Sequence, residues 1–112
     1  MNYKIKSRIW IERNGSILLG EGRISLLKAI EKEGSISKAA RSLGMSYKKA
    51  WSLVDAMNKR AQEPITSSNI GGKGGGGVQL TEYGRFLIIT FEKINRNCWI
   101  FLDKQIKKSG LL

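Results

Sequence analysis

The chain has 112 residues, with 20 Lys and Arg against nine Asp and Glu, so its formal net charge is +11. This length predicts a single domain over residues 1–112. A basic balance of this size favours nucleic acid as a polyanionic partner over a merely soluble basic surface. Histidine, the commonest general base near neutral pH and the commonest zinc ligand, is absent. We therefore expect a protein that is not an enzyme, with no catalytic residues, no cofactor and no metal site.

The cysteine content and the apolar runs bear on the compartment. Cys98 is the only cysteine, which excludes an internal disulfide and a zinc cluster and fits a reducing, cytoplasmic setting. No apolar run reaches the roughly 18 residues that a membrane span requires, and the first residues alternate in polarity, unlike a signal peptide. We expect a cytoplasmic protein with no membrane partner, in which Cys98 is a small buried apolar residue.

The N-terminal third predicts a hairpin followed by a helix. "YKIKSRIWIE", residues 3–12, alternates apolar and polar side chains, which is typical of a half-buried strand. Asn14–Gly15 is a strong signal for a tight turn, and "SILL" supplies the second strand. In "GRISLLKAIEKEG" apolar residues recur at helical spacing, and Gly34 marks the end of that helix. The expected buried face of this helix consists of Ile24, Leu27, Ala29 and Ile30.

Residues 35–61 meet the physical requirements of a helix-turn-helix. Ser35 and Ser46 stand where a side-chain oxygen can cap a helix N-terminus. Gly44 occupies the corner, where the chain leaves a helix with positive φ. The small Ala40 lets the second helix pack closely. The alternative is an ordinary helical hairpin with no role on DNA. The expected interior of the two helices consists of Ile36, Ala39, Ala40, Leu43, Ala50, Leu53, Val54 and Met57.

The residues opposite this interior are candidates for DNA contact. A recognition helix places its N-terminal residues at the base edges of the major groove, where lysine, serine and tyrosine can donate to bases or phosphates. The start of the preceding helix favours a phosphate. The candidates are Ser35, Ser37, Lys38, Ser46, Tyr47, Lys48, Lys49 and Ser52. Trp51 either braces the helix from its inner edge, which we favour, or lies against the DNA backbone.

Residues 65–80 predict a wing. "ITSSNI" and "VQL" are short β-prone segments on either side of "GGKGGGG", in which six glycines surround Lys73. A phosphate-binding loop would need Ser or Thr after the lysine and then a helix, whereas glycine and a strand follow here. A linker should join two domains, but only one helix follows. We therefore expect the run to be the tip of a wing, with Lys73 as its contact to the DNA backbone.

Residues 82–108 predict a long helix capped by Thr81. Its apolar residues cover much more than one stripe, so it must be covered on more than one side. In a monomer Trp99–Leu102 would remain in water, and exposed apolar patches of this kind mark interfaces. We expect a homodimer through this helix, aided by the N-terminal hairpin. The alternative is an intramolecular core with no partner chain.

The segments "GSISKAARSLGMSYKKAW" and "GGKGGGGVQLTEYG" together resemble the N-terminal DNA-binding domain of the ModE family of molybdate-responsive regulators. The match runs from about Gly22 to about Phe91, and a looser likeness to LysR-type helix-turn-helix proteins exists. The resemblance implies a mainly α fold with small β-hairpins, a winged helix-turn-helix with a long C-terminal helix. It also implies a dimer that binds palindromic operators in prokaryotes. It assigns Ser46–Lys49 to the recognition helix and Lys73 to the wing.

One departure from the family concerns the effector. Full-length ModE-like regulators carry C-terminal molybdate-binding domains, whereas this sequence stops directly after the expected long helix. We therefore expect no molybdate site here and allow for a separate effector-sensing partner. The favoured function is a sequence-specific, double-stranded-DNA-binding transcriptional regulator. The alternatives are a winged-helix module that binds protein and a non-specific DNA-binding protein without a regulatory role.

Overall fold

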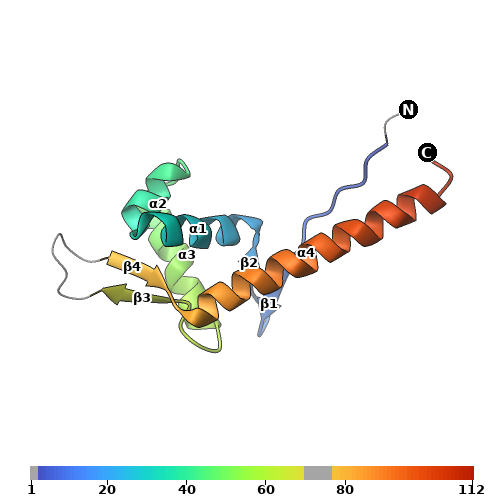
Figure 1. Cartoon of the computed structure of the whole chain (residues 1–112). Helices are drawn as coiled ribbons and strands as arrows, with labels where there is room; N and C mark the ends of the chain where they lie inside the picture. Colours follow the sequence, from blue (N-terminus) through green and yellow to red (C-terminus); the bar gives the residue numbers. More distant parts are fainter. Residues whose placement is uncertain (1–2, 70–76) are drawn as a thin grey trace.

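A computed structural model of the chain describes residues 3–69 and 77–112 (Figure 1). This part of the chain has the expected architecture, a mainly α winged helix-turn-helix with two small antiparallel hairpins and a long C-terminal helix. The elements in chain order are β1 (Trp10–Arg13), β2 (Ser16–Gly20), α1 (Glu21–Glu33), α2 (Ile36–Ser42), α3 (Tyr47–Arg60), β3 (Thr66–Asn69), β4 (Gly77–Leu80) and α4 (Glu82–Lys108). The far half of α4 extends away from the body (Figure 1).

The β1–β2 hairpin turns at the expected pair of residues. Asn14 and Gly15 have φ values of 54° and 80°, the two positive values that a tight turn of matching twist requires. Pairing begins only at Trp10, which lies opposite Gly20, because α1 starts directly after Gly20 and leaves no further strand to pair with. The strand expected over residues 3–12 is therefore wrong for its first seven residues.

Residues 3–9 form an extended N-terminal arm. The side chains of Ile5, Ser7 and Ile9 are half-buried while those between them are exposed, so the alternation predicted from the sequence persists without strand pairing. The arm contacts α4, where Ser7 Oγ lies 3.7 Å from Cys98 Sγ. Cys98 is half-buried, not fully buried as expected, because the narrow arm covers only part of the helix.

The corner between α2 and α3 is built by backbone hydrogen bonds around a left-handed glycine. Gly44 has a φ of 64°, and Met45 N–H donates to the Ala40 carbonyl at 2.9 Å. Leu43, expected inside the angle, is 41% exposed. It is the C-cap of α2 with non-helical backbone angles, so its side chain departs from the helical stripe that includes Ala40. Leu53, also expected there, is half-buried.

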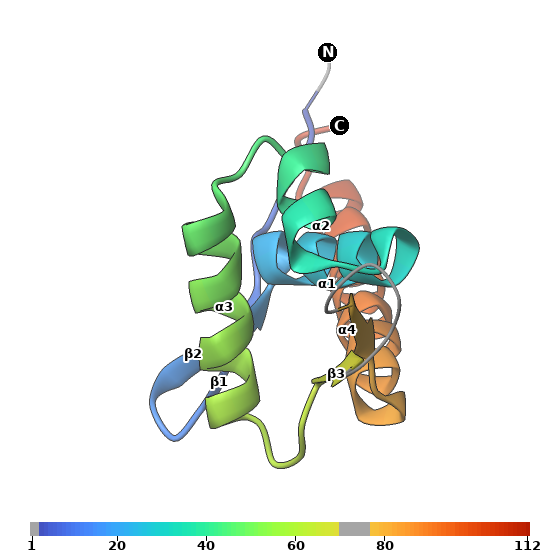
Figure 2. The ribbon, with the colours of Figure 1, turned by 90° about the vertical axis from the view of Figure 1, so that its left-hand side faces the viewer.

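The core forms around α1. This helix contacts α2, α4, β2 and β4, and Figure 2 shows it between α3 and α4. Contacts on several sides explain why Leu26, outside the expected stripe, is fully buried together with Leu27 and Ile30. The helix ends at Gly34, where φ is 77°. The other buried core residues are Leu18, Leu19, Ile24, Ile36, Ala39, Ala40, Ala50, Val54, Met57, Ile65, Leu80, Leu87, Ile88 and Phe91.

The first turns of α4 are fixed tightly to the segment that enters the wing. Thr81 caps the helix by accepting from Gly84 N–H at 3.0 Å, and Thr81 N–H donates to the Ile65 carbonyl at 2.9 Å. Gly84 is buried against Ile65, and a Cβ on Gly84 would overlap the Ile65 carbonyl oxygen. The backbone of α4 can therefore approach this closely only at a glycine.

We predict that Gly84→Ala destabilises the protein by about 1–3 kcal/mol, because the added methyl group must displace main chain at Ile65. Helix propensity alone would predict the opposite sign, a gain of about 1 kcal/mol. Gly22→Ala is the matched control, since Gly22 also lies in a first helical turn but a Cβ there meets nothing within 4 Å. Urea unfolding followed by circular dichroism measures both. Equal stability of the two variants would contradict the close contact.

Candidate nucleic-acid interface

The outer surface of α3 presents most of the predicted DNA-binding residues together. Ala50, Val54 and Met57 face the core, so the other side of the helix is exposed. Ser46 caps α3 by accepting from Lys49 N–H at 3.1 Å, as expected. We call the exposed first turns of α3 the recognition face, which consists of Tyr47, Lys48, Lys49, Trp51 and Ser52.

Trp51 belongs to this face. The side chain is 48% exposed, so the favoured expectation that it braces the helix from inside is wrong. Trp51 follows Tyr47 by four residues and lies on the same flank, at the border of the buried stripe of Ala50, Val54 and Met57. The sequence pattern alone could not exclude bracing, since a Trp at the border of an apolar stripe fits either side.

The first turn of α2 holds the remaining serine and lysine candidates. Ser35 Oγ accepts from Lys38 N–H at 3.1 Å, so this hydroxyl oxygen already caps the helix. Ser37 and Lys38 are exposed. The backbone bonds at the corner fix α2 relative to α3, which places both capped helix starts on one rigid unit.

The wing is anchored to the body at its base. Its strands pair antiparallel, with Thr66 opposite Leu80, and Val78 N–H donates to the Gly34 carbonyl at 3.0 Å. Lys73, the predicted wing contact, lies outside the described residues. The base of the wing is thus tied both to α1 and, through Ile65 and Thr81, to α4.

Asn58 connects α3 directly to the wing and was missed by the sequence analysis. Its Oδ1 accepts from Ile65 N–H at 2.7 Å and from Thr66 N–H at 3.1 Å, and its Nδ2 donates to Thr66 Oγ1 at 2.8 Å. A polar residue in the last turns of a helix is ordinary, so its type and spacing gave no signal. The one amide fixes the angle at which the wing leaves the recognition helix.

The cations near the recognition face are not neutralised by the described part of the protein. The ion pairs within residues 3–69 and 77–112 join Lys28 to Glu92, Lys59 to Asp55 and Arg85 to Glu31. None of them involves Lys38, Lys48 or Lys49. These three ammonium groups are therefore available to a polyanion, and their attraction will weaken as salt increases.

Arginines tie the β1–β2 hairpin to the end of α3. Arg13 Nη1 donates to the Arg60 carbonyl at 2.9 Å, and Arg60 Nη1 donates to the Ile17 carbonyl at 2.7 Å. Burial, together with the charge of Arg60, lowers the pKa of the Arg23 guanidinium, which nevertheless stays protonated at neutral pH. Cations beside the C-terminus of α3 are favourable for the helix dipole, so this cluster supports the helix from the hairpin side.

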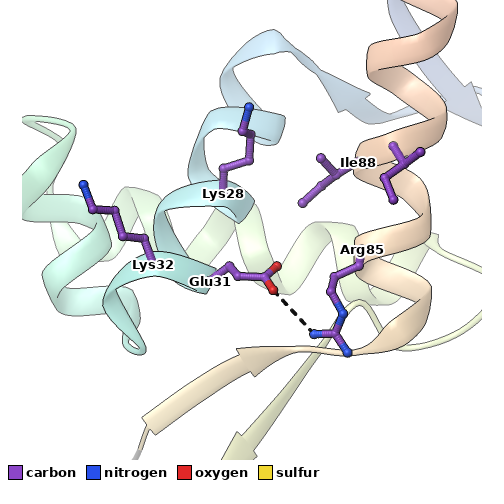
Figure 3. Close-up of a pocket in the computed structure, with 6 residues that line it drawn as sticks. Lys28, Glu31, Lys32, Arg85 and Ile88 are labelled. Carbon is purple, nitrogen blue, oxygen red and sulfur yellow. Dashed lines mark ion pairs between the residues drawn. The ribbon is translucent and has the colours of Figure 1, made fainter.

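An open groove lies between α1 and α4. It is lined by the aliphatic surface of Ile88 and Ile89 and by charged side chains, and its one carboxylate, Glu31, is paired with Arg85 (Figure 3). Among residues 3–69 and 77–112 no group of three His, Cys, Asp or Glu could hold a metal ion. No helix in that part is long and apolar enough to cross a membrane.

A capped helix with an exposed basic start, a glycine corner and an anchored β-hairpin define a winged helix-turn-helix DNA-binding domain. The sequence profile described as "Bacterial regulatory helix-turn-helix protein, lysR family" matches residues 22–85. The match covers more than half of the chain, and the chain therefore belongs to this family of regulatory proteins.

The chain is also similar to ModE-like proteins, as the sequence motifs predict. The molybdenum transport protein ModE of Azotobacter vinelandii is 40% identical over 98 residues, which are 88% of this chain and 36% of that protein. The molybdenum-pterin-binding protein MopB of Rhodobacter capsulatus is 46% identical over 84 residues, 75% of this chain and 31% of that protein. The DNA-binding transcriptional dual regulator ModE of Escherichia coli K12 is 47% identical over 70 residues, 62% and 27% of the two chains. The chain thus spans only about a third of the length of these relatives.

We predict that Asn58→Ala lowers the free energy of unfolding by about 1–3 kcal/mol, because it leaves the N–H groups of Ile65 and Thr66 without their acceptor. Asn58→Asp is the matched variant, since it retains the acceptor oxygen and the Thr66 hydroxyl can rotate to donate to the carboxylate. The free energy of unfolding should therefore fall less in Asn58→Asp than in Asn58→Ala. Denaturant unfolding of both variants tests this, and an equal loss would show that the acceptor bonds do not hold the wing.

Proposed function

We propose that the chain is a sequence-specific, double-stranded-DNA-binding transcriptional regulator, acting on a palindromic operator in the cytoplasm of a prokaryote. The observation that carries the proposal is the recognition face. It places at the capped start of α3 a serine, two aromatic rings and two lysines that form no ion pair with the described residues. The family match and the regulatory names of several relatives support the same function.

In the proposed complex the start of α3 enters the major groove. Lys48, Lys49 and Ser52 donate to base edges, with Ser46 and Tyr47 beside them. Ser35, Ser37 and Lys38 at the start of α2 contact phosphates, which position the domain without specifying sequence. Lys73 extends the contact to the backbone beside the groove.

We further propose that two copies associate through α4. Six large apolar side chains on this helix are exposed, namely Phe86, Ile89, Ile94, Trp99, Ile100 and Phe101. A monomer that leaves so many in water is unusual, and burial against a second copy would remove them from solvent. A two-fold dimer would match a palindromic operator, since each half-site then meets the same recognition face.

Selection from a library of random duplexes tests DNA recognition. We expect one motif to be enriched, and Lys49→Ala to change that motif because a base contact is removed. Lys73→Ala should instead weaken binding to all duplexes about equally and reduce the slope of log K against log salt by about one. Lys104→Ala, which removes the same charge from the exposed far half of α4, should leave both the motif and the affinity nearly unchanged.

Recovery of no motif above non-specific binding would overturn the regulator proposal. Binding without sequence preference would favour a non-specific DNA-binding protein. No DNA binding at all would favour a protein-binding module, for which the exposed apolar side chains of α4 offer a surface.

The dimer is tested by mass in solution. Sedimentation equilibrium at micromolar concentration should give twice the chain mass of 12.5 kDa. The double variant Ile100→Glu and Phe101→Glu should be monomeric, because it would bury two unpaired carboxylates in the interface. Ser25→Glu, on the exposed side of α1, is the control and should remain dimeric. A monomeric wild-type protein would contradict the interface.

A further inference from the structure

Two aromatic rings on α3 have no structural role that the described residues reveal. Tyr47 is 56% exposed and Trp51 is 48% exposed. Within residues 3–69 and 77–112 neither side chain makes a hydrogen bond, and the stacked aromatic pair there joins Tyr83 to Phe86. Both residues lie outside the core cluster and its half-buried neighbours. The rings are therefore free to meet a ligand.

Their position on the helix is regular. Four residues separate them, so they lie on one flank of α3 about 6 Å apart along its axis. Successive base pairs of B-DNA are about 3.4 Å apart, so two such rings span roughly two base steps of a helix that follows the groove. Lys48 and Ser52 follow them by one position each, and both are exposed. An apolar row thus runs beside a polar row on the recognition face.

The major groove contains one strongly apolar group. Base edges present hydrogen-bond donors and acceptors, and only thymine adds a methyl group. An indole ring can donate from its single N–H but otherwise offers apolar surface, and it makes poor use of a guanine edge. An exposed apolar ring on a helix that enters this groove therefore matches thymine better than any other base.

We propose that Trp51 is a specificity-determining residue that recognises the C5-methyl group of thymine, with Tyr47 supporting the same apolar row. The inference rests on the proposed DNA-binding function and adds the base that this flank of α3 selects. Lys48 and Ser52 recognise the hydrogen-bonding edges beside it. A contact between Trp51 and the sugar-phosphate backbone is the competing arrangement, and the two differ in whether they depend on sequence.

Removing single methyl groups from the DNA tests the proposal without altering the protein. Each thymine of the selected motif is replaced in turn by deoxyuridine, which removes only the methyl group, and affinity is measured by fluorescence anisotropy. The affinity of the wild-type protein should fall about fourfold for each removed methyl group that a ring contacts. For Trp51→Ala the same replacement should cause no loss, because the contact is already gone. Trp51→Gln repeats the test with a second side chain in case the alanine variant folds poorly.

Trp10→Ala is the matched control, since Trp10 is 54% exposed on the β1–β2 hairpin and should leave every deoxyuridine effect unchanged. The inference is overturned if the selected motif has no thymine or if deoxyuridine is tolerated throughout. It is also overturned if the Trp51 variants weaken all duplexes equally, which would place the ring on the backbone. If an enriched motif is still found in these cases, only the inference about Trp51 fails and the proposed function stands. If no motif is enriched at all, the proposed function itself fails.

Discussion

Ile65 is the point at which the recognition helix, the wing and α4 are joined. Its side chain is fully buried, its N–H donates to Asn58 on α3, and its carbonyl accepts from Thr81 at the start of α4. Gly84 leaves room for that carbonyl. Ile65 is central to the orientation of the wing relative to α3, because the second wing strand returns to the same place through Leu80 and Thr81. A change here would alter the position of the wing relative to α3 without changing a residue of the recognition face.

Local rules predicted much of the fold, and tertiary contacts decided the rest. The caps at Ser35, Ser46 and Thr81 and the left-handed glycines Gly34 and Gly44 depend on neighbouring backbone only, and these were predicted correctly. The hairpin turn is of the same kind. By contrast, the shortened β1 depends on where α1 begins. The bond network of Asn58 depends on a segment seven residues away that only the folded chain brings back to it. No spacing rule describes such a contact.

The candidate site divides in the same way. The exposure of Tyr47, Lys48, Lys49 and Ser52 was predicted because helix periodicity separates core from surface once Ala50, Val54 and Met57 are assigned to the interior. Trp51 was assigned to the wrong side because a large apolar ring at the border of a stripe can lie either inward or outward. Only the packing of the folded chain distinguishes the two positions. Lys73 illustrates a different limit, since a glycine run has no periodic pattern from which the direction of the lysine side chain could be predicted.

The composition of the recognition face suggests how affinity and specificity are separated. The chain has a net charge of +11, so phosphate attraction alone can supply binding, but it is the same for every sequence. Specificity must then come from few side chains. Lysine is a flexible point charge that tolerates several acceptors, whereas an aromatic ring has only two side-chain torsions and loses little entropy when it is placed. In the proposed complex a rigid ring beside flexible lysines would therefore give the face one element that fits a single base and others that adapt around it. The well-anchored corner at Gly44 keeps that ring in place, and small backbone shifts there should change sequence preference more than affinity.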